Sequence, residues 1–517
     1  MVNGKMVNML LCLLLSVTAA AQDASWWGAV VGLGHEQPFT DQALFDLNKQ
    51  DANNQIAPLF LSSEGEYMWS DKPFNFTVKN GVIRTSTPVV PVKVGSTLRE
   101  AYLAAQARYF PPSGQLPDTL FFTRPQYNTW IELMYNQNQE DILRYAHAVI
   151  DNGFPAGVLM IDDNWQRYYG NFCFKAERFP DAKAMISELH NLGFKVMVWV
   201  CPFVSPDSPE YRELAAKGYL LRDRDDNTAI LNWWNGYSAC YDLTNPKAAE
   251  HFVSLLRQAQ ADYGIDGFKF DAGDNNCYAS VTPLRAHEPK AANVDHTLSW
   301  AKIGLLFPFN EFRACWKMGG QPLVQRLGDK DYSWDAVQQL TPQMCVAGLL
   351  GHAFTCPDMI GGGQFTSFLN IDANAFDQAL IVRSAEVHAL MPMMQFSVAP
   401  WRILSPENLA IVQRMAQLHT EFAPYIMQYA RKAAETGEPI VRLMEYQFPH
   451  QGFAEVKDQF MLGDRYLVAP VVDNRLERDV HLPEGTWRDD QGKKYKGGKT
   501  YHIPVPLDRL PYFEKIK

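Results

Sequence analysis

The chain has 517 residues, of which 47% are hydrophobic and 13% are aromatic, and its formal net charge is −10. This composition excludes a disordered protein and leaves room for more than one domain. The negative charge argues against a nucleic-acid partner, because phosphate binding needs concentrated positive charge. The 13 Trp and 22 Tyr suit a sugar-binding site, and they equally suit an ordinary large core.

Residues 1–21 have the pattern of a secretory signal peptide. Lys5 supplies the positive charge, residues 9–17 are apolar, and small residues at 18–21 permit cleavage before Gln22. The apolar run is shorter than the roughly 20 residues that a membrane-spanning helix needs, and no other segment of the sequence could span a bilayer. We therefore expect an exported protein, either periplasmic or secreted.

The cysteines are scattered along the sequence. Of the eight, Cys12 lies in the leader, so seven remain (8 − 1), and this odd number leaves at least one thiol free. A protein of this size does not need disulfides to hold its core. We expect mostly buried thiols, with room for one bridge.

Residues 22–125 have a strand-like and turn-rich pattern. Apolar residues recur within 56–61, 66–69 and 74–78, and Asn80-Gly81 marks a turn. Short apolar segments broken by Asn-Gly and Pro signals are typical of antiparallel strands. We predict an N-terminal β-sandwich.

Strands and helices alternate between residues 126 and 435. Strands are expected at 127–133, 158–161, 195–200 and 267–270, and helices at 139–152, from Asp181 and from Pro246. This alternation indicates parallel βα units, which a doubly wound sheet and a closed barrel share. Acidic residues follow several different strands, at Asp162, Asp271 and Asp358, and this favours a (β/α)8 TIM barrel with its site at the carboxyl ends of the strands. Short β segments return in residues 436–517, which predicts a C-terminal β-sandwich.

Two carboxylates carry the strongest functional signal. Asp271 ends the apolar strand 267–270, and Asp329 follows a second apolar stretch in the segment Leu-Gly-Asp-Lys-Asp. Two carboxylates on one rim suit hydrolysis of a glycosidic bond, in which one stands near the anomeric carbon and the other protonates the leaving oxygen. Lys269, two residues before Asp271, would hold that carboxylate ionised or bind a sugar hydroxyl.

Structural roles compete with these assignments. Asp271, Asp329 or Asp331 could instead cap the helix that follows it. Paired carboxylates also suit other hydrolases, so the residues alone indicate a barrel enzyme that is a glycosidase or a related hydrolase.

The order of several segments resembles glycoside hydrolase family 31, the retaining α-glycosidases, from about Trp26 to the carboxyl end. The segments that carry the resemblance are Ile-Asp-Asp-Asn-Trp-Gln at 161–166, Arg-Phe-Pro at 178–180, Trp-Val-Cys-Pro-Phe-Val at 199–204, Lys-Phe-Asp-Ala-Gly-Asp at 269–274, Pro-Asp-Met-Ile-Gly-Gly at 357–362, Met-Pro-Met-Met-Gln-Phe-Ser at 391–397 and Asp-Gln-Phe-Met-Leu-Gly-Asp at 458–464. Within the family, the chain is most similar to the branch of α-galactosidases and myogenesis-regulating glycosidase-like proteins. It departs from the common α-glucosidase pattern at Lys269, at Gly273-Asp274 and at Gln395-Phe396-Ser397.

The resemblance implies roles for eight residues. Asp271 would be the nucleophile and Asp329 the acid/base. The walls and hydrogen-bonding groups of the sugar pocket would be Asp162, Asp163, Trp199, Trp234, Lys269 and Arg313. An ordinary surface position is the alternative for Arg313, a core position is the alternative for Trp234, and Asp358 would either reach the sugar or have a structural role near the glycines at 361–363.

The sequence thus predicts a retaining exo-α-glycosidase whose partner is an oligosaccharide or glycoside substrate, with an α-galactoside expected. An α-glucosidase or α-xylosidase on the same scaffold is the alternative, and a carbohydrate-binding protein without chemistry is a more remote one. No cofactor and no metal are expected, because both carboxylates act directly and no His/Cys/Asp cluster has metal-ligand spacing.

Overall fold

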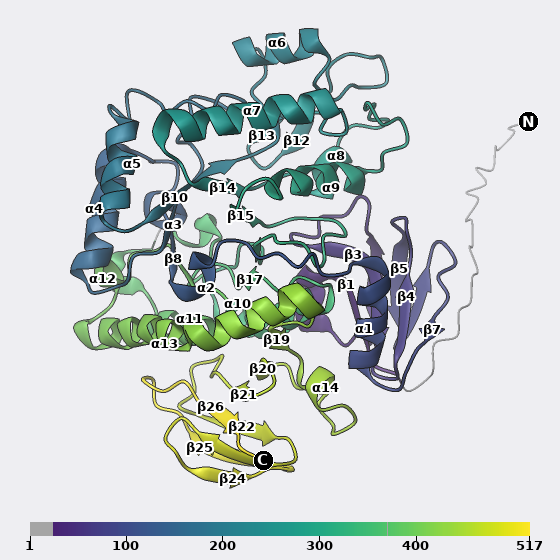
Figure 1. Cartoon of the computed structure of the whole chain (residues 1–517), viewed down its shortest axis with the longest axis vertical. Coiled ribbons are helices and arrows are strands. Elements are labelled where there is room, and N and C mark those ends of the chain that lie inside the picture. The colour runs from purple at the N-terminus through teal and green to yellow at the C-terminus, as the bar shows by residue number, and fades with distance from the viewer. Residues whose placement is uncertain (1–23, 370) are drawn as a thin grey trace, which may run out of the picture.

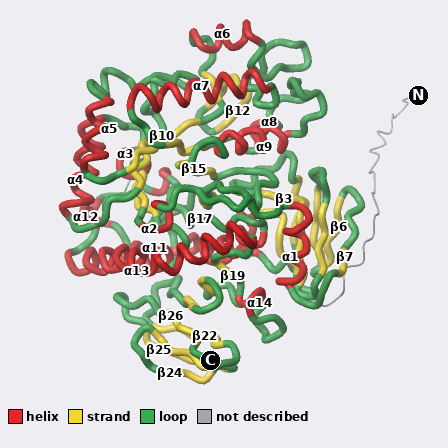
Figure 2. The backbone as a smooth tube through the Cα atoms, viewed as in Figure 1, coloured by secondary structure: helices red, strands yellow, loops and turns green. Residues whose placement is uncertain are grey.

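The computed structural model describes residues 24–369 and 371–517 (Figures 1 and 2). The predicted signal peptide, residues 1–21, lies outside these described residues. Antiparallel sheets at the N-terminal end, a central barrel and a C-terminal β-sandwich follow one another along the chain (Figure 1).

Eight parallel strands, taken in chain order, form the central sheet. They are β8 (Gln126–Asn128), β9 (Val158–Ile161), β10 (Lys195–Val200), β14 (Gly267–Phe270), β15 (Phe309–Phe312), β16 (Gln325–Arg326), β17 (Thr355–Cys356) and β18 (Gln395–Phe396). Each strand pairs with the next from β8 to β17, and β18 pairs with β8. The sheet nearly closes, since the Ile360 amide after β17 donates to the Gln395 carbonyl in β18 at 2.9 Å. This confirms the predicted TIM barrel.

Helices surround the barrel and connect its strands (Figure 1). They are α3 (Trp130–Leu133), α4 (Gln139–Asp151), α5 (Ala182–Asn191), α6 (Pro209–Lys217), α7 (Pro246–Tyr263), α8 (Asn275–Tyr278), α9 (Asn293–Gly304), α10 (Trp334–Leu349), α11 (Gln378–Ala389), α12 (Pro400–Ile403) and α13 (Pro406–Thr436), with 3-10 turns η2 (Phe365–Ser367) and η3 (Ala373–Ala375). The side chains of Asp181 and Asn245 cap α5 and α7 as their sequence signals indicate, and Gly264 ends α7 with a φ of 84°. A small sheet of β11 (Phe203–Val204), β13 (Gly236–Cys240) and β12 (Leu231–Trp233) lies in the loops after β10.

The predicted strand at 127–133 is wrong in its second half. The strand β8 stops at Asn128, and Trp130–Leu133 form the short helix α3. The Asn128 side chain accepts a hydrogen bond from the Trp130 amide at 2.9 Å, and this local turn ends the strand.

The N-terminal part contains two antiparallel sheets. One is β1 (Trp26–Val30), β3 (Ile56–Ser62), β4 (Glu66–Trp69) and β7 (Val92–Lys93), and the other is β2 (Gln42–Asp46), β5 (Asn75–Lys79) and β6 (Val82–Thr85), with the 3-10 helix η1 (Val31–Glu36). The helices α1 (Leu98–Tyr109) and α2 (Leu120–Thr123) follow these sheets and were not expected from the sequence. The signal for α1 was present, because Thr97 caps it and Leu98, Ala101, Tyr102 and Ala105 are buried at helical spacing.

The C-terminal part is the predicted β-sandwich. Its larger sheet contains β19 (Val441–Arg442), β20 (Phe460–Leu462), β21 (Tyr466–Val468), β26 (Tyr512–Lys515), β23 (Thr486–Asp489) and β24 (Lys494–Lys496), and its smaller one contains β22 (Glu477–Leu482) and β25 (Lys499–Pro504), with α14 (Met444–Gln447). Its own apolar core includes the buried residues Met461, Leu467, Trp487 and Phe513.

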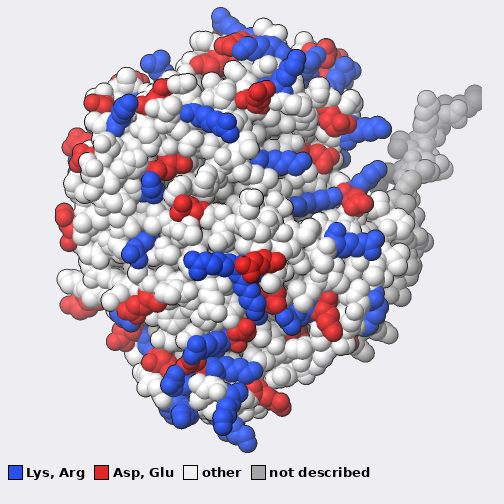
Figure 3. All heavy atoms as spheres, viewed as in Figure 1, with Lys and Arg blue, Asp and Glu red and all other residues white. Residues whose placement is uncertain are grey.

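The seven cysteines of the described chain carry free thiols, and all but Cys173 are buried, in line with the expectation. Among residues 24–369 and 371–517, no helix combines the length and the apolar character that crossing a membrane would take. On the face in Figure 3, acidic and basic side chains are interspersed over the barrel.

Candidate active site

A cavity of about 210 Å³ opens at the carboxyl ends of the barrel strands. Its lining contains the eight residues for which the family resemblance implied roles, which are Asp162, Asp163, Trp199, Trp234, Lys269, Asp271, Arg313 and Asp329. Both candidate catalytic carboxylates therefore face one space. Their chemical roles remain predictions.

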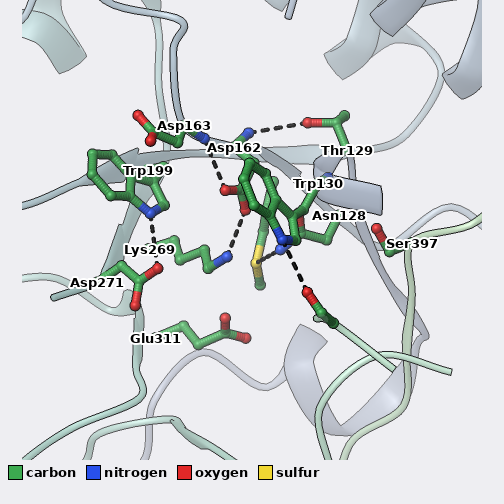
Figure 4. A network of polar contacts seen from close by, with 12 residues as sticks. Asn128, Thr129, Trp130, Asp162, Asp163, Trp199, Lys269, Asp271, Glu311 and Ser397 are labelled. Atoms are coloured by element: carbon green, nitrogen blue, oxygen red, sulfur yellow. Dashed lines mark hydrogen bonds and ion pairs between the residues drawn. The ribbon is translucent and has the colours of Figure 1, made fainter. Parts of the chain in front are cut away.

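Asp271 directly follows β14, where its backbone amide donates to the Val200 carbonyl at 2.9 Å. The Trp199 indole Nε1 donates to Asp271 Oδ2 at 2.9 Å (Figure 4). Arg313 Nε lies 3.3 Å from Asp271 Oδ1. Burial alone would raise the pKa of Asp271, but the charge of Arg313 and then of Lys269 outweighs it, so this pKa lies below its ordinary value. The carboxylate is thus held ionised, as a nucleophile requires. Asp271 does not cap a helix, because α8 begins after Asp274.

Lys269 forms a buried ion pair with Asp162. Its Nζ lies 2.5 Å from Asp162 Oδ2 (Figure 4), and both side chains are inaccessible except toward the cavity. Burial would lower the pKa of Lys269, but the charge of Asp162 outweighs this effect and raises that pKa above the ordinary value, so the lysine is held charged. The sequence predicts that Lys269 holds Asp271 ionised or binds a sugar hydroxyl. The lysine pairs with Asp162, and its charge contributes to lowering the pKa of Asp271. Together the pair presents a donor and an acceptor to the cavity.

Asp163 accepts hydrogen bonds from the Tyr169 hydroxyl and the Asn235 amide, both at 3.0 Å. Burial and then the neighbouring charge of Asp162 raise the pKa of Asp163 to about 7. This carboxyl is therefore the group in the cavity wall whose charge changes near neutral pH.

Asp163 supplies a stability prediction. Its pKa is higher in the folded chain than the roughly 3.9 of an unfolded aspartate, so the folded state holds the proton more tightly and wild-type stability falls as pH rises from about 4 to about 7. Asp163→Asn has no charge to bury. We therefore compare the difference between the thermal midpoints of the variant and of wild type at two pH values. We expect this difference to shift in favour of the variant by about 2–6 °C from pH 4.5 to pH 8. Calorimetry at the two pH values measures this, and a difference that does not change with pH would contradict it.

Arg313 is not a surface residue. Its Nη2 lies 2.6 Å from Asp274 Oδ2, its Nη1 donates to Asn53 Oδ1 at 2.5 Å, and its guanidinium carbon lies 4.9 Å from the centre of the Trp234 ring. Trp234 is 49% exposed, so it lies at the mouth of the cavity and not in the core. The planar fork of an arginine allows it to hold two carboxylates and stack on an indole at once.

Asp329 follows β16, and its side chain is 30% exposed. Arg326 Nη1 donates to Asp329 Oδ1 at 2.6 Å. The alternative that Asp329 or Asp331 caps α10 is wrong, because Ser333 is the cap and its hydroxyl accepts from the Ala336 amide. Asp358 is fully buried and does not line the cavity. Of the two roles that the sequence left open for it, the structure agrees with the structural one.

Five lining residues escaped the sequence reasoning. They are Asn53, Trp130, Tyr135, Gln364 and Phe365. Asn53 belongs to the N-terminal part and reaches the cavity by bonding Arg313, which no barrel pattern could show. Trp130, Tyr135 and Phe365 pack edge to face, with ring centres 5.2–5.9 Å apart, and form an aromatic wall. Aromatic rings suit the apolar faces of pyranoses. The only sign of this wall in the sequence was the large number of aromatic residues.

Comparisons with known proteins agree with this architecture. Residues 122–429 match the TIM-barrel domain of glycosyl hydrolases family 31, and residues 437–516 match the C-terminal domain of the same family. The chain is 32% identical to the myogenesis-regulating glycosidase of Mus musculus over 447 residues, covering 83% of this chain and 62% of that protein. It is 25% identical to the alpha-xylosidase of Emericella nidulans over 409 residues, covering 74% of this chain and 51% of that protein.

The fold is shared with solved structures of the same family. A GH31 dextranase of Flavobacterium johnsoniae, complexed with glucose, superposes with a TM-score of 0.82 at 21% identity, covering 95% of this chain and 65% of that one. The chain spans about half to two thirds of the length of these curated relatives.

Proposed function

Because the chain belongs to glycosyl hydrolase family 31, we propose that it is a retaining exo-α-glycosidase that releases a terminal α-linked sugar, with an α-galactoside as substrate. The observation that carries the proposal is the meeting of Asp271 and Asp329, from two different barrel strands, in one cavity. An exo mode of action agrees with a cavity whose base is the buried Asp162–Lys269 pair and whose mouth is Trp234.

The reaction is a double displacement. An oxygen of Asp271 attacks the anomeric carbon while the bond from that carbon to the leaving oxygen breaks, and Asp329 gives its proton to that oxygen. Water then attacks the same carbon, Asp329 takes a proton from it, and the bond to Asp271 breaks. Two inversions return the α configuration.

The choice of an α-galactoside rests on the positions where this chain departs from the α-glucosidase pattern. Lys269 lines the cavity and pairs with Asp162, and Asp274 bonds Arg313. These groups alter the pattern of donors and acceptors that a sugar meets, and glucose and galactose differ only in the orientation of one hydroxyl. A site that hydrogen-bonds a hydroxyl in one orientation discriminates strongly against the other.

A panel of three substrates tests this choice. We expect kcat/KM on para-nitrophenyl α-galactoside to exceed that on the α-glucoside and the α-xyloside by about tenfold or more, because a mismatched hydroxyl leaves buried polar groups unpaired. Preference for the glucoside or the xyloside would assign the alternative specificity on the same scaffold. Binding of sugars without hydrolysis of any of the three would favour a carbohydrate-binding protein.

We also propose that the protein is exported. This proposal is supported by the signal-like pattern of residues 1–21.

A further inference from the structure

A buried arginine lies directly beneath the candidate acid/base. Arg326 ends β16, and its side chain is 1% exposed. Three carboxylates surround its guanidinium: Asp329 Oδ1 lies 2.6 Å and Asp358 Oδ1 2.9 Å from Nη1, and Glu311 Oε1 lies 3.5 Å from Nε. A charge buried this deeply is tolerated only when such partners compensate it.

The barrel also fixes two of these carboxylates, those of Asp358 and Glu311. Asp358 follows β17, and its Oδ2 accepts from the Lys330 backbone amide at 2.8 Å, so it also holds the residue next to Asp329. Glu311 lies on β15, inside the barrel below Lys269 (Figure 4), and its Oε2 accepts from the Gln395 amide at 2.9 Å. Both carboxylates are fully buried. The guanidinium is thus held from the two strands that flank β16.

Only one member of this cluster reaches the substrate space. Asp329 lines the cavity, whereas Arg326, Asp358 and Glu311 do not. Asp329 Oδ1 is occupied by Arg326, and in the part of the chain that the structure describes no hydrogen bond engages Oδ2. The two oxygens of one carboxylate therefore have different surroundings.

We propose that Arg326 is the positioning residue of the acid/base: held by Asp358 and Glu311, it fixes Oδ1 of Asp329 and leaves Oδ2 to carry the proton. This inference rests on the proposed function, since it presumes that Asp329 exchanges a proton with the substrate. In the first step the proton moves from Oδ2 to the leaving oxygen, and Arg326 stabilises the carboxylate that forms. In the second step Oδ2 takes a proton from the attacking water.

The arrangement also explains why an arginine stands at this position. Lysine would bring the same charge, but its ammonium is a single point and could not reach Glu311, Asp329 and Asp358 at once. With lysine in place of Arg326, Asp329 would lose its fixed orientation while the cluster kept its charge balance. Proton transfer, which depends on geometry, is the step that should suffer.

Arg326→Lys tests the inference through the leaving group. An alkyl or sugar aglycone needs a proton to depart, whereas 2,4-dinitrophenolate leaves without one. We expect kcat/KM to fall about 10–100-fold on the methyl α-glycoside and by less than about threefold on the dinitrophenyl α-glycoside of the same sugar. A loss of equal size on both substrates, or no loss on either, would overturn the proposal.

Arg383→Lys is the matched control. Arg383 is another buried arginine, paired with Glu386 at 2.8 Å, and it packs on carbonyls of the C-terminal part away from the cavity. We expect this variant to show no dependence on the leaving group. If Arg326→Lys does not fold by circular dichroism, Asp358→Asn replaces it, because it keeps the side-chain shape and removes one of the charges that hold the guanidinium. The same selective loss is expected there, and an unselective result overturns the proposal.

The outcome for Asp329 itself separates this inference from the proposed function. If Asp329→Ala shows no dependence on the leaving group, the assigned acid/base is wrong. If Asp329→Ala shows a dependence on the leaving group and the Arg326 and Asp358 variants do not, Asp329 is the acid/base and Arg326 does not position it.

Discussion

Asp271→Asn is expected to lower kcat by about 10⁴-fold or more, the scale of losing a covalent nucleophile. The amide is nearly the same size as the carboxylate but cannot form the glycosyl ester. Trp199 and Arg313 would still line the cavity, so the affinity for substrate should remain within about tenfold of wild type. Single-turnover kinetics and calorimetric titration with the released sugar measure the two quantities. Asp271→Ala, which cannot revert by deamidation, should agree.

Asp274→Asn is the matched control for the nucleophile. Asp274 lies three residues further, is more deeply buried than Asp271, and also pairs with Arg313. Burial raises the pKa of Asp274 to about 6, whereas the pKa of Asp271 is lowered. We expect Asp274→Asn to retain formation of the covalent intermediate, detected by mass spectrometry after trapping with a fluorinated glycosyl fluoride. A trapped sugar on any residue other than Asp271 would refute the assignment.

The fold could be predicted where apolar runs mark buried strands. The segments 158–161, 195–200 and 267–270 are strands at the predicted residues, because buried parallel strands are mostly apolar runs, interrupted here only by Lys195 and Lys269. The strands β16 and β18 were not predictable in this way. Each has two residues and includes a buried polar side chain, Arg326 or Gln395, whose partners lie on other strands or in the loops that follow them.

The site residues also differ in whether the sequence alone could show that they lie close together. Lys269 lies on β14 and Asp271 directly follows that strand, so the sequence alone showed that they are near neighbours. Asn53 and Arg313 are 260 residues apart and meet only when the N-terminal part packs on the barrel. The Asp162–Lys269 ion pair likewise depends on the parallel order of β9, β10 and β14. A sequence shows which groups could do chemistry, whereas their partners are set by strand order.

Asp329→Ala should separate substrates by their leaving groups more strongly than any other variant. We expect kcat/KM on the methyl α-glycoside to fall about 10²–10⁴-fold, because general acid catalysis is lost. The dinitrophenyl α-glycoside should still form the intermediate, which then accumulates because no base activates water. Azide attacks without deprotonation, so adding it should restore turnover and yield the α-glycosyl azide.

Asp331→Ala is the control that the chain offers for this variant. Asp331 is an exposed carboxylate two residues beyond Asp329, and it accepts from the Ser367 hydroxyl outside the cavity lining. It shares the local charge of Asp329 but cannot reach the leaving oxygen. We expect neither a dependence on the leaving group nor an effect of azide there. Equal losses on both substrates in Asp329→Ala, without an azide product, would place the acid/base elsewhere on the rim. Among the described residues no hydrogen bond engages Oδ2 of Asp329, and this carboxyl lines the same cavity as an ionised Asp271, which makes such a result unexpected.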